Sequence, residues 1–530
     1  MSIQQLMADF KNIWKEDLLS GFLVSLIALP LSLGIAGASG FPPIMGVLTA
    51  IVGGIVVSFF AGSQLTIKGP AAGLIVIVAG SVSELGKGDD ILGWKLTLVA
   101  IVISGFIQVL MGIGRVARLS SYFPVAAIHG MLAAIGIIIM SKQILLAEGI
   151  SPVLLKGKEP LELIEMIPEM AGRIEWHIAT IGIVSLLIMF LWPQIQNKKV
   201  RKIPPAVIVI LASIILGRIF HLHDKTYLSL KPLVNPGSLE LNFNAGFNFI
   251  DNSNIIILTK YIIMLSLIGT IESLLTGKAI DLMDPYKRKS DLNKDISAIG
   301  IGNMVSGLFG GLPMISEVAR SSANISNGGR TRFANLFHGL SLLIMVLLLG
   351  PLVKTIPVAA LSGLLIYVGF KLAHPKEFKN MKELGSDQLI VFLVTIITTL
   401  ITDLLLGVSL GVLTKLIINF ADGAKLKFLF KLDYEKQEYE DRIVFKAKSA
   451  ALFTNWNYFN KHIAELPDTK EIIIDFSNSK LIDHTFLKSI YLLSDDYKRF
   501  DKKITLIFSD LHKGKSAHSL SKKLLIQPND

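Results

Sequence analysis

Cysteine is absent from this chain of 530 residues, and only 18% of its residues are charged. The absence of cysteine excludes a disulfide framework, a thiolate metal site and a cysteine nucleophile. Soluble domains carry roughly a quarter charged residues, so the low share of charge argues against an ordinary soluble enzyme. Histidine, aspartate and glutamate show no metal-site spacing, and no nucleophile stands in a pattern with a base. We therefore expect neither an enzyme nor a bound cofactor.

Apolar residues, by contrast, make up 52% of the chain and concentrate before about residue 420. A membrane helix needs roughly 20 predominantly apolar residues, and runs of this kind recur. They lie at residues 19–37, 43–61, 94–113, 124–142, 175–193, 203–219, 254–277, 293–309, 333–350, 353–372, 386–402 and 404–420. Two shorter segments, 70–83 and 315–326, follow extended stretches rich in glycine and proline, and we interpret them as half-helices. The sequence therefore predicts an α-helical polytopic membrane protein with fourteen membrane segments.

The charges of the connecting loops support this count. With the N-terminus in the cytoplasm, the loops on the cytoplasmic side carry Arg115, Arg118, Lys198, Lys199, Arg201, Lys202, Lys287, Arg288, Lys289, Arg330, Arg332, Lys371, Lys376, Lys379, Lys425 and Lys427. The loop after the fifth segment lies outside and is acidic. This asymmetry is the positive-inside pattern, so the formal net charge of +11 is mainly a topology signal. We expect an integral protein of a bacterial inner (plasma) membrane, with both termini cytoplasmic and no nucleic-acid partner.

Fourteen segments divide into two sets of seven, and an odd number per set inverts the second set relative to the first. The half-helix is the third segment of each set, and such paired interruptions indicate a transporter's binding site. The start of a half-helix presents unpaired N–H groups and the positive end of a dipole, so two facing starts bind an anion. Gly69 and Pro70 would begin the first half-helix, and Pro313 and Ser316 the second. The alternative is glycine-proline loops between ordinary helices.

Four motifs resemble the SulP family of anion transporters: ALPLS at 28–32, IKGPAA at 67–72, GTIESLLT at 269–276 and GIGNMVSGLFGGLP at 300–313. The last two are most similar to the sodium-dependent bicarbonate transporters of cyanobacteria within that family. The resemblance implies a core domain of segments 1–4 and 8–11 that moves against a gate domain of segments 5–7 and 12–14. It also implies a homodimer.

Glu272 lies within an apolar run, where a charge is costly enough to indicate a function. Thr276 follows one turn later on the same helical face. In the bicarbonate transporters an aspartate and a threonine at the matching positions help to bind sodium. The resemblance therefore implies a coupling-ion site at Glu272, Thr276 and Ser316, with Na⁺ as the one possible bound metal. With glutamate in place of aspartate, the coupling ion can be Na⁺ or H⁺. A third interpretation is that Glu272 is a structural carboxylate.

Arg320 matches an arginine that the family often carries, where it adds positive potential near the anion. Glu317 either pairs with Arg320 or contributes to the cation site. Lys68 either attracts the anion or extends toward an interface, and we expect His129 to be a packed polar group. The predicted anion site consists of Gly69, Pro70, Ala71, Ala72, Met314, Ile315, Ser316, Glu317, Val318 and Arg320.

From about residue 440 the sequence resembles that of a soluble domain. Apolar strands at 471–477 and 503–508 flank a helix at 483–499, with Asp483 or His484 near its N-cap. This order predicts a small α/β domain and resembles a STAS domain. His484 and Thr485 stand where related domains carry a phosphorylatable serine, so that route of regulation is doubtful. We expect residues 1–18 to be a cytoplasmic segment, 19–425 the transport domain, and 440–530 a cytoplasmic STAS-like domain that could bind a protein partner.

Together these patterns predict a secondary active transporter of a small inorganic anion, bicarbonate or sulfate. It would work across the lipid bilayer by alternating access and be coupled to Na⁺ or H⁺. One alternative is an uncoupled anion channel, which has no need of a buried carboxylate such as Glu272. The others are a nucleobase or dicarboxylate permease of the same architecture. A nucleobase permease would place carboxylates or amides in the pocket, whereas the first half-helix offers only small residues.

Overall fold

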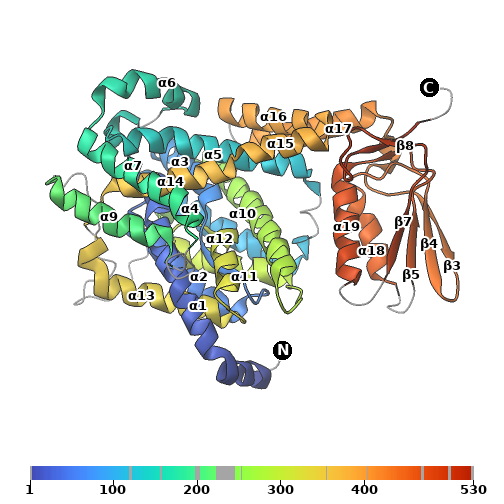
Figure 1. The fold of residues 1–530 in the computed structure, drawn as a ribbon, viewed down its shortest axis with the longest axis horizontal. Helices are drawn as coiled ribbons and strands as arrows, with labels where there is room; N and C mark the ends of the chain where they lie inside the picture. Colours follow the sequence, from blue (N-terminus) through green and yellow to red (C-terminus); the bar gives the residue numbers. More distant parts are fainter. Residues whose placement is uncertain are drawn as a thin grey trace. The chain divides into compact units, whose positions relative to one another are not determined.

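The computed structural model describes residues 3–117, 122–155, 158–196, 203–222, 245–251, 254–353, 355–402, 404–466, 471–498 and 503–526. The chain forms two compact units (Figure 1). The first consists of Met1–Ala117 and Ile135–Leu372, and the second of Arg118–Ala134 and Ala373–Asp530.

Helices dominate the first unit, and every predicted membrane segment of the chain contains one. The first unit holds α1 (Ile3–Ala38), α2 (Pro43–Phe60), α3 (Ile75–Gly86), α4 (Asp90–Ile113), α6 (Pro160–Met170), α7 (Trp176–Leu191), α9 (Pro205–Ile219), α10 (Ile255–Met283), α11 (Leu292–Leu308), α12 (Val318–Ser326), α13 (Phe333–Val353) and α14 (Val358–Leu372). Helix α5 (Val125–Ala147) starts in the second unit, which also holds α15 (Pro375–Leu384), α16 (Ser386–Ile401) and α17 (Leu404–Ala421). Short 3₁₀ turns are η1 (Ala72–Leu74), η3 (Pro152–Leu155), η4 (Ala171–Arg173), η5 (Trp192–Gln194), η7 (Phe247–Phe249) and η8 (Leu426–Phe428).

Among the described residues, eight helices are long and apolar enough to cross a membrane, and four shorter helices are also apolar. Helix α13, one of the four shorter helices, carries exposed apolar residues along one side. Ile344, Leu347 and Leu348 form one stripe on its surface, and they are 55%, 62% and 73% exposed. A contiguous exposed apolar stripe of this kind is expected where hydrocarbon replaces water.

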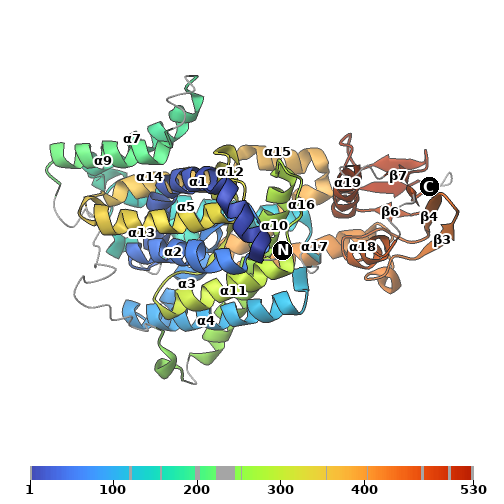
Figure 2. The same ribbon diagram turned by 90° about the horizontal axis from the view of Figure 1, so that it is seen from below.

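The opposite sides of these helices pack on one another through small and aliphatic residues. Helix α1 packs against α2 and α13, and α11 packs against α4 (Figure 2). Ala28 and Leu33 of α1, Val47 and Ala50 of α2, and Leu342 of α13 belong to one buried cluster. Small residues let helix backbones approach closely, which is the main source of helix association in lipid.

Two short strands interrupt the helices of the first unit. Strand β1 (Ile67–Pro70) precedes η1 and α3, and β2 (Met314–Glu317) precedes α12. The strands pair antiparallel, so each satisfies backbone groups of the other where water is excluded. The half-helices therefore start later than predicted: at Ala72 with a 3₁₀ turn and at Val318, instead of at Gly69–Pro70 and Pro313. The extended stretch expected before the first half-helix is confirmed.

The second unit contains a four-stranded sheet in the order β3 (Tyr434–Glu438), β4 (Arg442–Ala447), β5 (Glu471–Asp475) and β7 (Ile504–Ile507). Strands β3 and β4 form an antiparallel hairpin, whereas β4, β5 and β7 run parallel. Helices α18 (Trp456–Ala464) and α19 (His484–Lys498) cover one face (Figure 1). A smaller sheet holds β6 (Leu481–Ile482), β9 (Lys523–Leu525) and β8 (His512–Gly514). The two predicted strands and the helix between them are confirmed, while β3, β4 and α18 were not predicted.

Of the two predicted N-cap residues of α19, Asp483 and His484, the hydrogen bonds identify Asp483. Asp483 Oδ1 accepts a hydrogen bond of 2.9 Å from the Phe486 N–H, and Oδ2 accepts one of 2.6 Å from the Phe453 N–H. Asp483 is therefore the N-cap. Next to it, His484 Nδ1 lies 2.8 Å from the carbonyl oxygen of Leu520, and burial lowers the pKa of His484 to about 4. The ring is therefore neutral at pH 7 and donates its Nδ1–H to that carbonyl.

Candidate functional site

The pairing of β1 with β2 brings the two halves of the predicted anion site together. The register places Lys68 opposite Ser316, Gly69 opposite Ile315, and Pro70 opposite Met314. All six residues are buried. Of the remaining predicted residues, Ala71 is buried, Ala72 and Glu317 are partly buried, Val318 is 48% exposed and Arg320 is buried.

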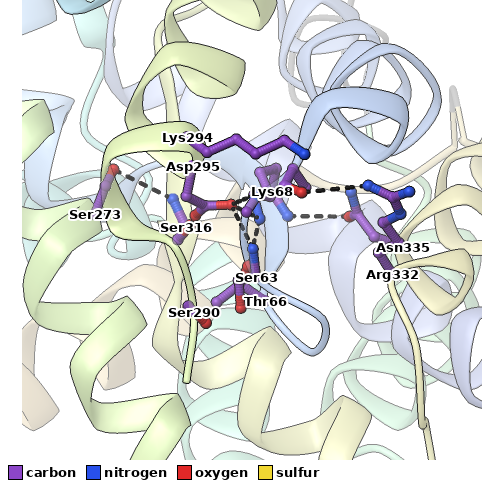
Figure 3. A network of polar contacts seen from close by, with 12 residues as sticks. Ser63, Thr66, Lys68, Ser273, Ser290, Lys294, Asp295, Ser316, Arg332 and Asn335 are labelled. Carbon is purple, nitrogen blue, oxygen red and sulfur yellow. Dashed lines mark hydrogen bonds and ion pairs between the residues drawn. The ribbon is translucent and has the colours of Figure 1, made fainter. Parts of the chain in front are cut away.

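Strand β2 is held in place by side chains from α10 and α11, and a side chain from α4 holds one of these in turn. Asn303 of α11 accepts a hydrogen bond of 2.6 Å from the Met314 N–H and donates one of 3.3 Å to its carbonyl oxygen. Asn303 also donates to Gln108 Oε1 of α4 at 2.7 Å. The Ser316 N–H donates to Ser273 Oγ of α10 at 3.4 Å (Figure 3). Asn303 and Ser273 lie within the two motifs at 300–313 and 269–276, although neither was predicted as a site residue.

Arg320 is 1% exposed and retains free hydrogen-bond donors. Its Nη2 donates to Ser32 Oγ of α1 at 3.2 Å, whereas Nε and Nη1 have no hydrogen-bond partner among the described residues. The guanidinium lies over Gly69, where an added Cβ would come within 2.1 Å of Nη1. A side chain at this position of β1 would therefore displace the guanidinium from where it lies. A buried guanidinium with two free N–H-bearing nitrogens next to the strand pair is suited to bind an anion.

Glu317 extends from the start of the second half-helix to the start of the first. Its Oε1 lies 3.5 Å from the Ala72 N–H, from which it accepts a hydrogen bond. Within the described part of the chain it forms no direct ion-pair contact with Arg320, although the two opposite charges attract each other. A carboxylate therefore already occupies one of the backbone donors that we expected an anion to use.

Glu272 of α10 is buried against the first half-helix. Its Oε1 has no hydrogen-bond partner among the described residues, and an added Cβ on Gly73 would come within 2.1 Å of that oxygen. The carboxylate also repels that of Glu317. Thr276 is buried one turn further along α10. The structure thus places Glu272 beside the predicted anion site, whereas the third predicted coupling residue, Ser316, donates its hydroxyl to Asp295 Oδ2 at 3.1 Å.

Lys68 matches neither of its two predicted roles. Its side chain is fully buried, so it does not extend to an interface, and its Nζ lies 2.9 Å from Asp295 Oδ1 (Figure 3). It also donates to Thr66 Oγ1. Asp295 neutralises this charge and was not predicted from the sequence. It stands in the first turn of α11 behind an aspartate N-cap, where an acidic residue is ordinary.

Comparison with known proteins identifies similar sequences. A model described as the sulfate permease family matches residues 14–395. YvdB of Bacillus subtilis, whose name gives sulfate transport as a provisional assignment, is 27% identical over 419 residues, 79% of this chain and 73% of that protein. The bicarbonate transporter BicA of Picosynechococcus sp. is 24% identical over 391 residues, 73% of this chain and 67% of that protein.

Two solved structures share the fold. The transmembrane domain of a cyanobacterial bicarbonate transporter BicA superimposes with a TM-score of 0.64 at 22% identity, over 76% of this chain and 98% of that one. The structure of SLC26A9 gives a TM-score of 0.66 at 15% identity, over 94% of this chain and 84% of that one. At these identities the two matches show similarity of fold alone.

Proposed function

This chain belongs to the sulfate permease family, and on that premise we propose that it is a secondary active transporter of a small inorganic oxyanion, sulfate or bicarbonate. Members of this family are transporters, so the expectation that the chain is not an enzyme is confirmed. The observation that carries the proposal is Arg320, a buried guanidinium whose Nε and Nη1 have no partner among the described residues. A buried cation with free donors is costly unless an anion completes it.

The anion in this proposal binds between the starts of η1 and α12. Backbone N–H groups at both starts and the guanidinium of Arg320 would share its negative charge. Gly69 and Gly73 have no side chains of their own, so Arg320 and Glu272 can lie directly against the backbone there. A site of this kind accepts a compact oxyanion. In the described part of the chain, the side-chain amides of Asn303 and Asn335 bind the backbone of β2 and β1, which leaves them engaged and unable to recognise a nucleobase.

For the coupling ion we propose H⁺ in place of Na⁺. Glu272 and Glu317 carry two carboxylates beside the single guanidinium of Arg320, so an anion would enter a site that is already negative by one formal charge. One proton on either carboxylate removes that surplus, so the anion and the proton would bind together. Na⁺ at Glu272, Thr276 and Ser316 is the alternative, because the Ser316 hydroxyl donates its proton to Asp295 and keeps its oxygen lone pairs for a cation.

The architecture expected for such a transporter completes the proposal. We assign fourteen membrane segments in a 7+7 inverted repeat, with core and gate domains that move by alternating access. Residues 1–18 and a STAS-like domain at 440–530 would both be cytoplasmic, and the protein would be a homodimer in a bacterial plasma membrane. The parallel strands β4, β5 and β7 with α18 and α19 on one face support the STAS-like assignment. The basic loops on one side support the orientation.

The test is uptake of radiolabelled sulfate, bicarbonate or a dicarboxylate by proteoliposomes, driven by a proton gradient, a sodium gradient or neither. We expect proton-driven uptake of one of the two inorganic anions. Glu272→Gln should abolish the stimulation by the proton gradient, whereas the matched control Glu383→Gln, an exposed residue of α15, should not. Sodium-driven uptake would overturn the choice of coupling ion.

Two other results would contradict the assignment as a secondary active transporter of a small inorganic anion. Anion currents that persist without a gradient, and that exceed any carrier turnover, would identify a channel. Uptake of dicarboxylates alone would identify a permease for larger anions.

Within the proposed site, a bulky residue at Ala71, which is buried, should obstruct binding of the transported anion. Unchanged affinity would place the site elsewhere.

A further inference from the structure

The ion pair between Lys68 and Asp295 lies beside the proposed anion site without contributing a free charge to it. Asp295 is 2% exposed, and its two oxygens accept four hydrogen bonds. Oδ1 accepts from Lys68 Nζ at 2.9 Å and from the N–H groups of Gly62 and Ser63 at 3.1 and 3.2 Å, and Oδ2 accepts from Ser316 Oγ at 3.1 Å. A buried carboxylate with this set of donors is fully compensated, provided that the cation stays in place.

The two side chains that Asp295 binds are partners across the strands. Lys68 of β1 and Ser316 of β2 stand opposite each other in the antiparallel register. One carboxylate from α11 therefore joins the two strands within their paired stretch, two residues before α12 begins and four residues before η1 begins (Figure 3). The backbone of Lys68 is held as well, because its N–H donates to Asn335 Oδ1 of α13 at 3.1 Å.

We propose that Lys68 is a covalently tethered cation that, through Asp295, fixes the pairing of β1 with β2 and so positions both half-helix starts for the anion. Lys68 and Asp295 are positioning residues, since the charge of Lys68 is neutralised before it can reach the substrate. The expected effect on anion binding rests on the proposed function. The role of Lys68 in holding the two strands can be tested without measuring transport. Removing the lysine side chain leaves Asp295 with three neutral donors and with space that a small soluble cation can fill.

The experiment is chemical rescue of Lys68→Ala. Radiolabelled sulfate and bicarbonate are exchanged between equal concentrations inside and outside proteoliposomes at one pH, so the weak base methylammonium cannot act through a proton gradient. We expect the half-saturating anion concentration to rise about tenfold in the variant. Methylammonium should restore it to within about threefold of the wild-type value, whereas the bulkier tetramethylammonium should not. The wild type should respond to neither cation.

Lys294→Ala is the matched control, because Lys294 precedes Asp295 on α11 and is exposed (Figure 3). It should keep the wild-type half-saturating concentration. An unchanged value in Lys68→Ala, or a raised value that methylammonium does not lower, would overturn the inference. The melting temperature of purified Lys68→Ala provides a second readout, and methylammonium should raise it selectively. If the wild type exchanges neither anion, the proposed function fails, and this melting measurement still decides the role of Lys68.

The neutral pair Lys68→Met with Asp295→Asn covers the case in which Lys68→Ala does not fold. This double variant leaves no buried charge unpaired, so it should fold. Its half-saturating anion concentration should stay above the wild-type value and should not respond to methylammonium. A wild-type value would show that the charged link does not position the site. Failure of the neutral pair to fold would assign the ion pair to stability alone, and would equally overturn the inference.

Discussion

The two half-helices start from paired strands of the same length but carry different side chains. The start of the first offers Gly69, Ala72 and Gly73, which provide space and backbone donors but no charge. The start of the second carries Glu317 and Arg320. Glu272, Glu317 and Arg320 come from the second half of the chain, and the glycines that accommodate Glu272 and Arg320 come from the first. Lys68 of the first half is neutralised by Asp295. The two starts thus have similar backbones but different side chains. Substitutions at the two starts should therefore change anion binding by different amounts.

The largest effect is expected at the charged start. Arg320→Gln removes the buried guanidinium, which we propose to bind the anion directly. The half-saturating anion concentration should rise about 100-fold, since a buried charge-assisted contact is worth roughly 3 kcal/mol. Uptake by proteoliposomes measures it. Arg330→Gln is the control, because the side chain of Arg330 forms an exposed ion pair with Glu16, and its hydrogen bonds to Asp17 and Arg288 use the backbone. Equal effects of the two variants would remove Arg320 from the site.

At the uncharged start, the addition of a single methyl group should be harmful. Gly69→Ala places a Cβ 2.1 Å from Arg320 Nη1, so the guanidinium must move. We expect about a tenfold rise in the half-saturating anion concentration, because overpacking of this kind costs about 1–3 kcal/mol. Gly172→Ala meets no atom within 4 Å and should have no effect. A Gly69→Ala variant with wild-type affinity would mean that the position of Arg320 over Gly69 is unimportant.

Glu317→Gln is expected to have a smaller effect, and to lower the half-saturating anion concentration instead of raising it. The amide keeps the shape of the side chain but removes a negative charge next to the Ala72 N–H, where the anion would bind. Above neutral pH the half-saturating anion concentration should fall about threefold to tenfold, and its dependence on pH should become flatter. Exchange of radiolabelled sulfate and bicarbonate over a range of pH values measures both quantities. A weaker affinity in the variant would mean that Glu317 helps to bind the anion and does not compete with it.

The smallest effect on transport is expected from His484 at the start of α19, whose titration must be separated from that of the carboxylates in the anion site. Burial lowers the pKa of His484 from 6.5 to about 4, so the unfolded domain binds the extra proton first. The contribution of the neutral ring is complete above pH 6.5 and is lost as the pH falls toward about 4. At pH 5 the loss is on the order of 2 kcal/mol.

Hydrogen exchange of α19 in the full-length protein measures this loss. After correction for intrinsic rates, protection should be lower at pH 5 than at pH 7. In His484→Asn, which keeps a donor for the Leu520 carbonyl, the difference should disappear. Protection that changes equally in both proteins would point to another titrating group. Transport should have the same pH profile in both.

Most of the helices and the positions of the two half-helices could be predicted from the sequence. Hydropathy located the helices, because membrane segments need long apolar runs, and the glycine-proline stretches located the two interruptions. The paired strands were missed, since four residues are too short for periodicity to distinguish a strand from a loop. Asp295 was missed because an acidic residue in the first turn of a helix is common, and only the fold brings it to Lys68. The direction of Glu317 likewise depends on contacts between segments far apart in the sequence.

The absence of cysteine makes one direct test of the anion site possible, because a single introduced cysteine is the only thiol of the chain. Ala72→Cys and Val318→Cys place that thiol at the first and second half-helix starts, and Gly172→Cys places it outside the site. The measurement is the rate of modification by a soluble thiol reagent with and without a saturating concentration of the transported anion. The anion should slow modification at both starts about fivefold or more and leave the Gly172→Cys rate unchanged. If the transported anion protects neither start, it does not bind between the two half-helices.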